Sequence, residues 1–136
     1  MSIGTQIRNP VDVRLADPDV EPVVDWCQAN SERNAFDRDV LSYPSTKILA
    51  AHDNGTTYGY LPVQGAAILD SFGPNPEATP IQITAALIQL VKGAGLMAYA
   101  NGMRELLMLA SDETTALGAE QMGFEKLPFT VYRKRL

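Results

Sequence analysis

The side chains that most often carry out chemistry are scarce in this sequence of 136 residues. It has one histidine, His52, and one cysteine, Cys27, so a zinc site of the usual cysteine and histidine type is not expected. No serine lies in a nucleophile motif such as G-x-S-x-G that would pair with His52. His52 borders the turn Asp53-Asn54-Gly55 and is predicted to lie at the surface. Cys27 falls on the apolar face of a predicted helix, which favours a small core residue over a reactive thiol.

Backbone amides offer a second kind of chemistry where a helix begins. Thr79-Pro80-Ile81-Gln82 matches a capping box, with threonine at the N-cap, proline at the first helical position and glutamine at the third. The first amides of a helix lack partners within it, and the helix dipole favours an anion beside them. The later run Lys92-Gly93-Ala94-Gly95 lacks the spacing of a P-loop. Its two glycines are predicted to be close-packing positions, where a strand or another chain approaches the helix.

The composition is that of a soluble globular protein with its own core. Apolar residues make up 46% of the chain and charged residues 20%, both ordinary values. The net charge of −5 disfavours nucleic acid as a partner, since the binding of nucleic acid rests on neutralising its phosphates. The basic run Arg133-Lys134-Arg135 is predicted to be a solvated strand end. The length suggests one domain over 1–136, with a core of about 11–135.

Targeting signals are not evident in the sequence. One cysteine excludes an intrachain disulfide and fits a reducing compartment. The N-terminus, MSIGTQIRNP, has no apolar run of signal-peptide length. The candidate membrane span, residues 81–100, contains Gln82, Thr84, Gln89 and Lys92, whereas a span needs about 20 strongly apolar residues. We therefore expect no membrane partner and a cytoplasmic protein, or one carried in a virion if a phage encodes it.

Hydrophobic periodicity and turn signals predict ten elements in the order β-α-α-β-β-β-α-β-α-β. The clearest turn is Asp53-Asn54-Gly55, where Asn-Gly tolerates positive φ at both positions of a tight hairpin. Antiparallel hairpins come first and β-α-β crossovers later, which predicts a mixed α/β fold. The predicted strands cover 11–15, 46–52, 57–63, 65–72, 104–110, 124–127 and 129–133. The last two are counted as one strand broken at Pro128.

The predicted helices differ in how much of their surface is apolar. The first begins at Asp17-Pro18, and the second covers residues 31–41. The third covers residues 80–100 and is polar only along a narrow stripe, so it is predicted to be buried nearly all round. The fourth is capped by Ser111-Asp112-Glu113 and ends at Gly123. The predicted inward face of the first helix consists of Val20, Val23, Val24 and Cys27.

Three short segments resemble the GNAT acetyltransferase superfamily. The first strand and helix, residues 13–20, are similar to the opening of that family. Tyr58-Gly59-Tyr60-Leu61 resembles its third strand after a hairpin. Met122-Gly123-Phe124-Glu125, followed by Tyr132, resembles its ending. The resemblance covers roughly residues 11–135. It implies a single domain with a central mixed antiparallel and parallel sheet flanked by helices.

The resemblance also implies a site and a cofactor, acetyl-CoA. In that family the fourth strand is splayed and offers backbone groups to the pantetheine arm, which corresponds here to Leu69 and Ser71. The strand often carries a general base, which corresponds to Asp70; the alternative is a solvated or helix-capping carboxylate. The next loop gives amides to the pyrophosphate at the start of the long helix. The matching amides belong to Ala78, Thr79, Ile81 and Gln82, and no metal is implied.

The sequence departs from the family pattern at the two places that matter for chemistry. The loop 74–80 has no glycine and three prolines, each of which lacks an N–H donor. Glu77 adds negative charge where a pyrophosphate would lie. Ala119 occupies the position of the family's tyrosine, which serves as general acid.

Two functions stay open at this point, so the sequence leaves undecided whether the protein is an enzyme. The first is a non-catalytic or strongly divergent assembly or binding module that works as a homo-oligomer or with assembly partners, including as a structural component of a phage. The second is an acetyl-CoA-dependent N-acetyltransferase acting on a small amine or a protein amine.

Overall fold

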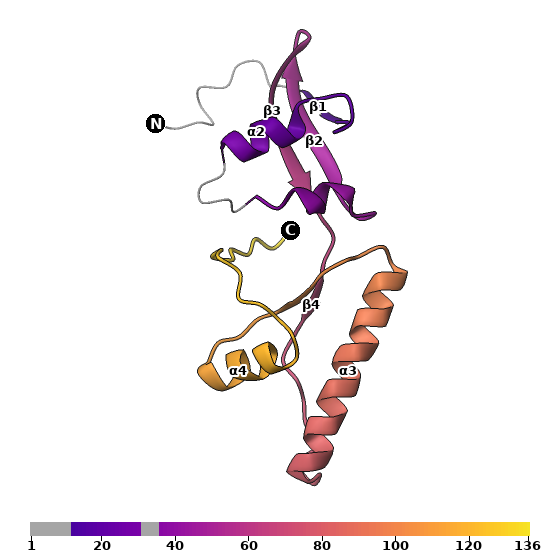
Figure 1. Ribbon diagram of the computed structural model, residues 1–136, viewed down its shortest axis with the longest axis vertical. Helices are drawn as coiled ribbons and strands as arrows, with labels where there is room; N and C mark the ends of the chain where they lie inside the picture. The colour runs from indigo at the N-terminus through magenta and orange to yellow at the C-terminus, as the bar shows by residue number, and fades with distance from the viewer. Residues whose placement is uncertain (1–11, 31–35) are drawn as a thin grey trace. The chain divides into compact units, whose positions relative to one another are not determined.

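The computed structural model of the chain describes residues 12–30 and 36–136 (Figure 1). The chain divides into two compact units, Met1–Gly65 and Ala66–Leu136. The first contains an antiparallel sheet and the second a parallel pair of strands, which confirms the mixed α/β class. The single domain over 1–136 stays a prediction, and each unit is described below by itself.

The first unit is built on three antiparallel strands, β1 (Asp12–Leu15), β2 (Lys47–Asp53) and β3 (Thr56–Val63), in the order β1-β2-β3. The turn between β2 and β3 is the predicted one. Asn54 has φ 48° and Gly55 has φ 80°, the pair of positive angles that a two-residue turn needs to match the twist of its strands. The predictions of both hairpin strands and of their turn are confirmed.

One face of this sheet carries the core of the first unit. Ile48 and Ala50 on β2 are buried, as is Val23 of the helix α2 (Val23–Ala29), which contacts β3. Side chains alternate between the two faces of a strand, so the residues next to these point the other way. On that second face Leu15, Leu49 and Leu61 lie in register, and Leu15 and Leu61 are 64% and 62% exposed.

The first predicted helix begins later than the sequence suggests. Residues 17–20 form a turn, because the Asp17 carboxylate accepts the amide of Asp19 and so favours a local turn over a helix. Val20 is therefore 79% exposed instead of facing the core. Part of the second predicted helix, residues 31–35, lies outside the described residues. The described remainder holds the short 3-10 helix η2 (Arg38–Ser42).

The second unit consists of β4 (Ala67–Leu69), α3 (Pro80–Ala100), β5 (Leu106–Met108) and α4 (Glu113–Gln121). β4 and β5 pair in parallel, with Ala67 opposite Leu106 and Leu69 opposite Met108. The predicted parallel crossover through the long helix is confirmed. Gly123 has φ 92° and ends α4 as predicted. Figure 1 shows the uninterrupted course of α3.

Several extents predicted for the second unit are wrong. The strand predicted over 65–72 has three residues and Ile68 is 56% exposed, so it is not the most buried strand. In the described structure, residues 124–127 and 129–133 are not in strands. Only Ala98 of α3 is buried, and Leu96 is 76% exposed, so the helix is not buried nearly all round. A strand requires a partner strand for its backbone hydrogen bonds, and a buried helix requires other elements that pack over it. The periodicity of the sequence specifies neither.

Within this chain no close approach requires glycine at either predicted packing position of α3, and the predicted approach of another chain stays a prediction. A Cβ added at Gly93 would meet nothing within 4 Å, and one added at Gly95 would lie 3.7 Å from Cδ1 of Leu106, an ordinary contact. α3 is long and apolar enough, by length and composition, to cross a membrane. One such helix in the described part of the chain is weak evidence and is not enough to indicate a membrane protein.

Candidate functional site

The start of α3 forms the capping box that the sequence predicts. Thr79 Oγ1 accepts the amide of Gln82 at 3.3 Å, and Gln82 Oε1 accepts the amide of Thr79 at 3.0 Å. Each residue therefore satisfies one backbone donor of the other. The box fixes the first turn of the helix. Because both amides already donate hydrogen bonds within it, neither is free to bind a ligand.

The loop before α3 satisfies another of the predicted phosphate donors by itself. The carbonyl of Asn75 accepts the amide of Ala78 at 3.1 Å, and Asn75 Oδ1 accepts the amide of Glu77 at 3.0 Å. These bonds close a turn on the asparagine, as asparagine commonly does. Among the four amides predicted for a pyrophosphate, only that of Ile81 has no partner in the described part of the chain. Three of the four already donate within the protein.

The end of β4 carries the predicted backbone and carboxylate groups. Leu69 is the last residue of β4 and is paired with Met108 of β5. Asp70 and Ser71 follow directly, outside the strand, and both are exposed. Within the described residues the Asp70 carboxylate has no hydrogen bond or ion pair, as expected of a solvated group. The structure places Leu69 beside Met108 of β5, and the role of Asp70 as general base stays a prediction.

The position expected to hold a catalytic tyrosine lies inside α4. Ala119 is 8% exposed and belongs to the small core of the second unit. The start of α4 is capped by Asp112, whose carboxylate accepts the amide of Thr115 at 2.7 Å. This bond and the one from the Thr115 hydroxyl hold the pKa of Asp112 below its usual value. At position 119 the chain therefore has a packing residue and no proton donor.

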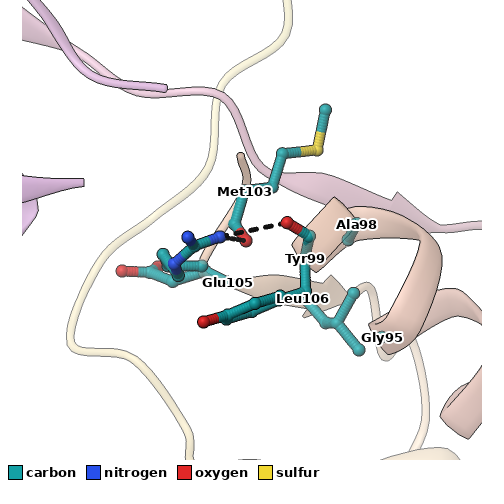
Figure 2. Close-up of a pocket in the computed structure, with 7 residues that line it drawn as sticks. Gly95, Ala98, Tyr99, Met103, Glu105 and Leu106 are labelled. Carbon is teal, nitrogen blue, oxygen red and sulfur yellow. Dashed lines mark hydrogen bonds between the residues drawn. The ribbon is translucent and has the colours of Figure 1, made fainter. Parts of the chain in front are cut away.

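A small hollow lies at the other end of α3 (Figure 2). Its volume is about 170 Å³, below the 300 to 1,000 Å³ usual for small-molecule sites. Arg104 donates to the carbonyl oxygens of Tyr99 at 3.2 Å and Met103 at 2.9 Å, and its guanidinium lies 3.9 Å from the centre of the Tyr99 ring. The hollow is lined by Gly95, Ala98, Tyr99, Met103, Arg104, Glu105 and Leu106.

Arg104 caps the C-terminal end of α3. A cation at this position donates hydrogen bonds to the last carbonyl groups and interacts favourably with the negative end of the helix dipole. Sequence reasoning missed this role, although a basic residue soon after Asn101-Gly102 is a signal for it. α3 has 21 residues and so is about 30 Å long. The hollow and the predicted amides therefore lie at opposite ends of one helix and do not form one site.

The remaining reactive side chains offer no second centre. Burial raises the pKa of the Cys27 thiol, which disfavours the thiolate, although the side chain is half-buried and does not lie in the core as predicted. His52 is half-buried on β2, and its pairing opposite Asp12 belongs to the strand ladder. Among the described residues no group of three or more histidine, cysteine, aspartate or glutamate side chains is placed to hold a metal ion.

Comparisons with known proteins return structural matches alone. No protein-family model matches the chain, and no curated protein does. A structure of aminoglycoside N-acetyltransferase AAC(6')-Iy in complex with CoA matches with TM-score 0.42 and 16% identity, over 92% of this chain and 100% of that chain. The same enzyme with a bisubstrate analog gives TM-score 0.36 and 17% identity, over 94% and 100%. YycN from Bacillus subtilis gives TM-score 0.35 and 16% identity, over 92% and 99%.

Over most of its length the chain is similar to structures of an acetyltransferase.

Proposed function

We propose that this protein is a non-catalytic module on an acetyltransferase-like α/β pattern and that it acts through assembly or binding. One observation carries the proposal: the amides at the start of α3 are used inside the protein. Ala78, Thr79 and Gln82 donate to Asn75 and to the capping box. An anion at this helix start would find Ile81 as its one unpartnered amide among the four.

The cost of opening these bonds supports the same proposal. Each protein hydrogen bond contributes about 0.5 to 1.5 kcal/mol net, so releasing three of them would offset much of the attraction of a pyrophosphate. Pro74 and Pro76 cannot replace the lost donors because they have no N–H. Glu77 in the same loop is exposed and repels a phosphate.

Assembly has support in the second unit, where apolar side chains of α3 are exposed. Ile81 is 83% exposed, Leu90 61% and Leu96 76%. Exposed apolar surface of this kind marks contact with another surface when it is contiguous. The partner in our proposal is another copy of the chain or an assembly partner, and a phage particle is one setting in which such a module would work.

An acetyl-CoA-dependent N-acetyltransferase is the second candidate. The observation that favours it is the parallel pairing of β4 with β5, which ends at Leu69 and Met108 just before Asp70 and the loop. In this alternative Asp70 would deprotonate an amine, and the backbone at Leu69 and Ser71 together with the amide of Ile81 would hold acetyl-CoA.

Isothermal titration calorimetry of the full chain with acetyl-CoA, and with desulfo-CoA for comparison, separates the two candidates. We expect no binding heat up to millimolar cofactor. We expect the same for Glu77→Gln, because removing the loop charge does not free the amides, and for the matched control Glu105→Gln. Micromolar binding by the wild type would overturn the proposal. Asp70→Asn and a screen of amines would then test the second candidate.

A further inference from the structure

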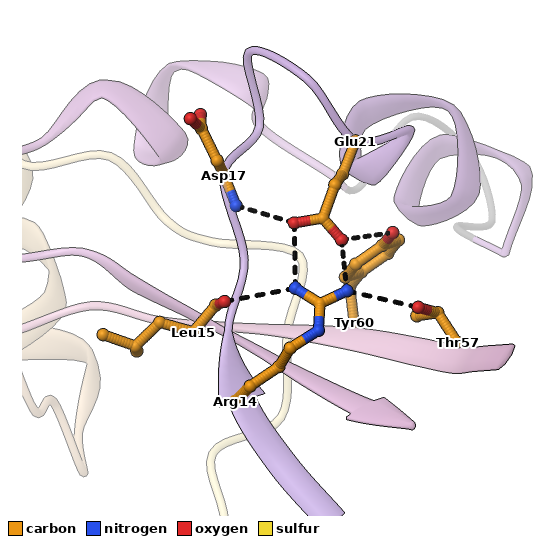
Figure 3. Close-up of polar contacts among 6 residues, drawn as sticks. All are labelled: Arg14, Leu15, Asp17, Glu21, Thr57 and Tyr60. Atoms are coloured by element: carbon orange, nitrogen blue, oxygen red, sulfur yellow. Dashed lines mark hydrogen bonds and ion pairs between the residues drawn. The ribbon is translucent and has the colours of Figure 1, made fainter. Parts of the chain in front are cut away.

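A polar network in the first unit joins three segments of the chain at Glu21 (Figure 3). Arg14 of β1 forms a two-pronged ion pair with Glu21, with Nη1 3.0 Å from Oε2 and Nη2 bonded to Oε1. The Tyr60 hydroxyl of β3 donates to Glu21 Oε1 at 3.2 Å, and the amide of Asp17 donates to Oε2 at 2.9 Å. Arg14 Nη2 also donates to Thr57 Oγ1 at 3.2 Å. The carboxylate of Glu21 is thus the centre of the network.

The register of the sheet allows the Arg14 side chain of β1 to extend across β2 to β3. Arg14, Ala50 and Tyr60 lie opposite one another on β1, β2 and β3. Ala50 is fully buried, and its small side chain leaves room for the guanidinium to extend over β2. A larger residue at position 50 would separate Arg14 from β3. Glu21, which precedes the N-cap Pro22 of α2, is thereby connected to both edge strands of the sheet.

The helix α2 has few other attachments to the sheet. Val23 is its one fully buried side chain. Trp26 contacts the Tyr60 ring with centroids 5.1 Å apart and the planes tilted by 49°, and it remains 43% exposed. A seven-residue helix with one fully buried side chain and one ring contact is marginal without further support.

We propose that the Glu21 carboxylate is a latch that holds α2 on the sheet, and that loss of its charge releases α2 while β1, β2 and β3 stay paired. The latch works because the ion pair requires an ionised carboxylate, and because the Tyr60 hydroxyl and the Asp17 amide bond more strongly to an ionised acceptor than to a neutral one. Protonation leaves Arg14 without its counter-charge and weakens every bond that holds the segment leading into α2.

The groups that face Glu21 define when the latch opens. β1 supplies the cation of Arg14, β3 supplies the hydroxyls of Tyr60 and Thr57, and β2 supplies the uncharged Ala50. Hydrogen bonding to Arg14, and then to the Asp17 amide, lowers the pKa of Glu21 from 4.5 to about 2. The folded pKa lies below the unfolded one, so this stabilisation is complete above about pH 4.5 and is lost as the pH falls through about 2. The Asp17 carboxylate points away from the network (Figure 3).

The single tryptophan of the chain reports directly on α2. We would titrate the full-length protein from pH 7 to pH 1.5, following Trp26 by fluorescence and near-ultraviolet circular dichroism and the sheet by far-ultraviolet circular dichroism. The expected result is a change of the Trp26 signals between about pH 4.5 and 2 that precedes loss of the far-ultraviolet signal. In Glu21→Gln we expect Trp26 to be released already at pH 7 and to stay constant over that range.

Matched variants keep the test decisive. Asp25→Asn removes a carboxylate of α2 outside the network and should keep the wild-type transition. Arg14→Lys keeps the charge but loses the two-pronged geometry, so its transition should move up towards pH 4.5, and this variant carries the test if Glu21→Gln does not fold. The proposal is wrong if the wild-type Trp26 signals are flat between pH 4.5 and 2, if Glu21→Gln keeps the transition, if Arg14→Lys leaves it in place, or if the sheet unfolds together with Trp26.

Discussion

Single polar residues organise the start of α3 and decide what that helix can bind. Thr79 and Gln82 exchange hydrogen bonds, and Asn75 closes the turn before them. The same amides would serve a phosphate if glycines held the loop open, because glycine brings the backbone close to a ligand without a Cβ. Here groups of the protein accept hydrogen bonds from these amides. The helix start can therefore form its cap or bind a phosphate, but not both at once.

Replacing the capping residue should destabilise the protein measurably. Thr79→Ala removes the acceptor for the Gln82 amide, and loss of such a cap costs about 1 kcal/mol, with a range of about 0.5 to 2. Urea denaturation followed by circular dichroism would give the change in unfolding free energy. Thr84→Ala, at an exposed position inside the same helix, is the control and should be neutral or slightly stabilising because alanine is the better helix former. Equal losses in both variants would contradict the assigned cap.

Among the elements, α3 combines an apolar sequence with an exposed surface. Its contact with β5 is made near its C-terminal end, where Ala98 is buried and Gly95 faces Leu106. Along the rest of the helix Ile81, Leu90 and Leu96 are largely exposed, whereas other apolar side chains are half-buried. Such a helix depends for stability on its cap, on its intrinsic propensity and on whatever surface it meets.

The glycines of α3 test directly whether another surface covers the helix. Alanine at Gly93 meets nothing within 4 Å, and alanine at Gly95 makes an ordinary contact with Leu106. Each substitution should therefore raise the unfolding free energy by up to about 1 kcal/mol, the difference in helix propensity. Thermal unfolding at low protein concentration would measure it. A lower melting temperature for Gly93→Ala would instead mean that a backbone or side chain packs closely there.

For the molecule as a whole, the proposed module predicts self-association or partner binding. Light scattering coupled to size exclusion should give a mass above that of the 14.8 kDa chain. Leu96→Lys places a charge on the exposed apolar part of α3 and should shift the distribution towards the monomer. Gln89→Lys, at an exposed polar position of the same helix, should leave it unchanged. A monomeric wild type at all concentrations would count against a homo-oligomer and leave a different partner.

The sequence by itself determined the features that rest on residues close together in the chain. The Asn54-Gly55 turn, the hairpin around it, the box of Thr79 and Gln82 and the stop at Gly123 all follow from local sterics and hydrogen bonds. The same reasoning could have predicted that the loop amides form hydrogen bonds within the protein, because an asparagine such as Asn75 commonly forms turns.

Only the tertiary structure decided the features that join distant residues. Arg14, Glu21 and Tyr60 meet because the pairing of β1, β2 and β3 places them together, and the apolar pattern of one strand does not state which other strand pairs with it. The same limit explains the exposed α3 and the missing strands at 124–127 and 129–133. Apolar patterning states which side chains favour burial, and it leaves open which surface will bury them.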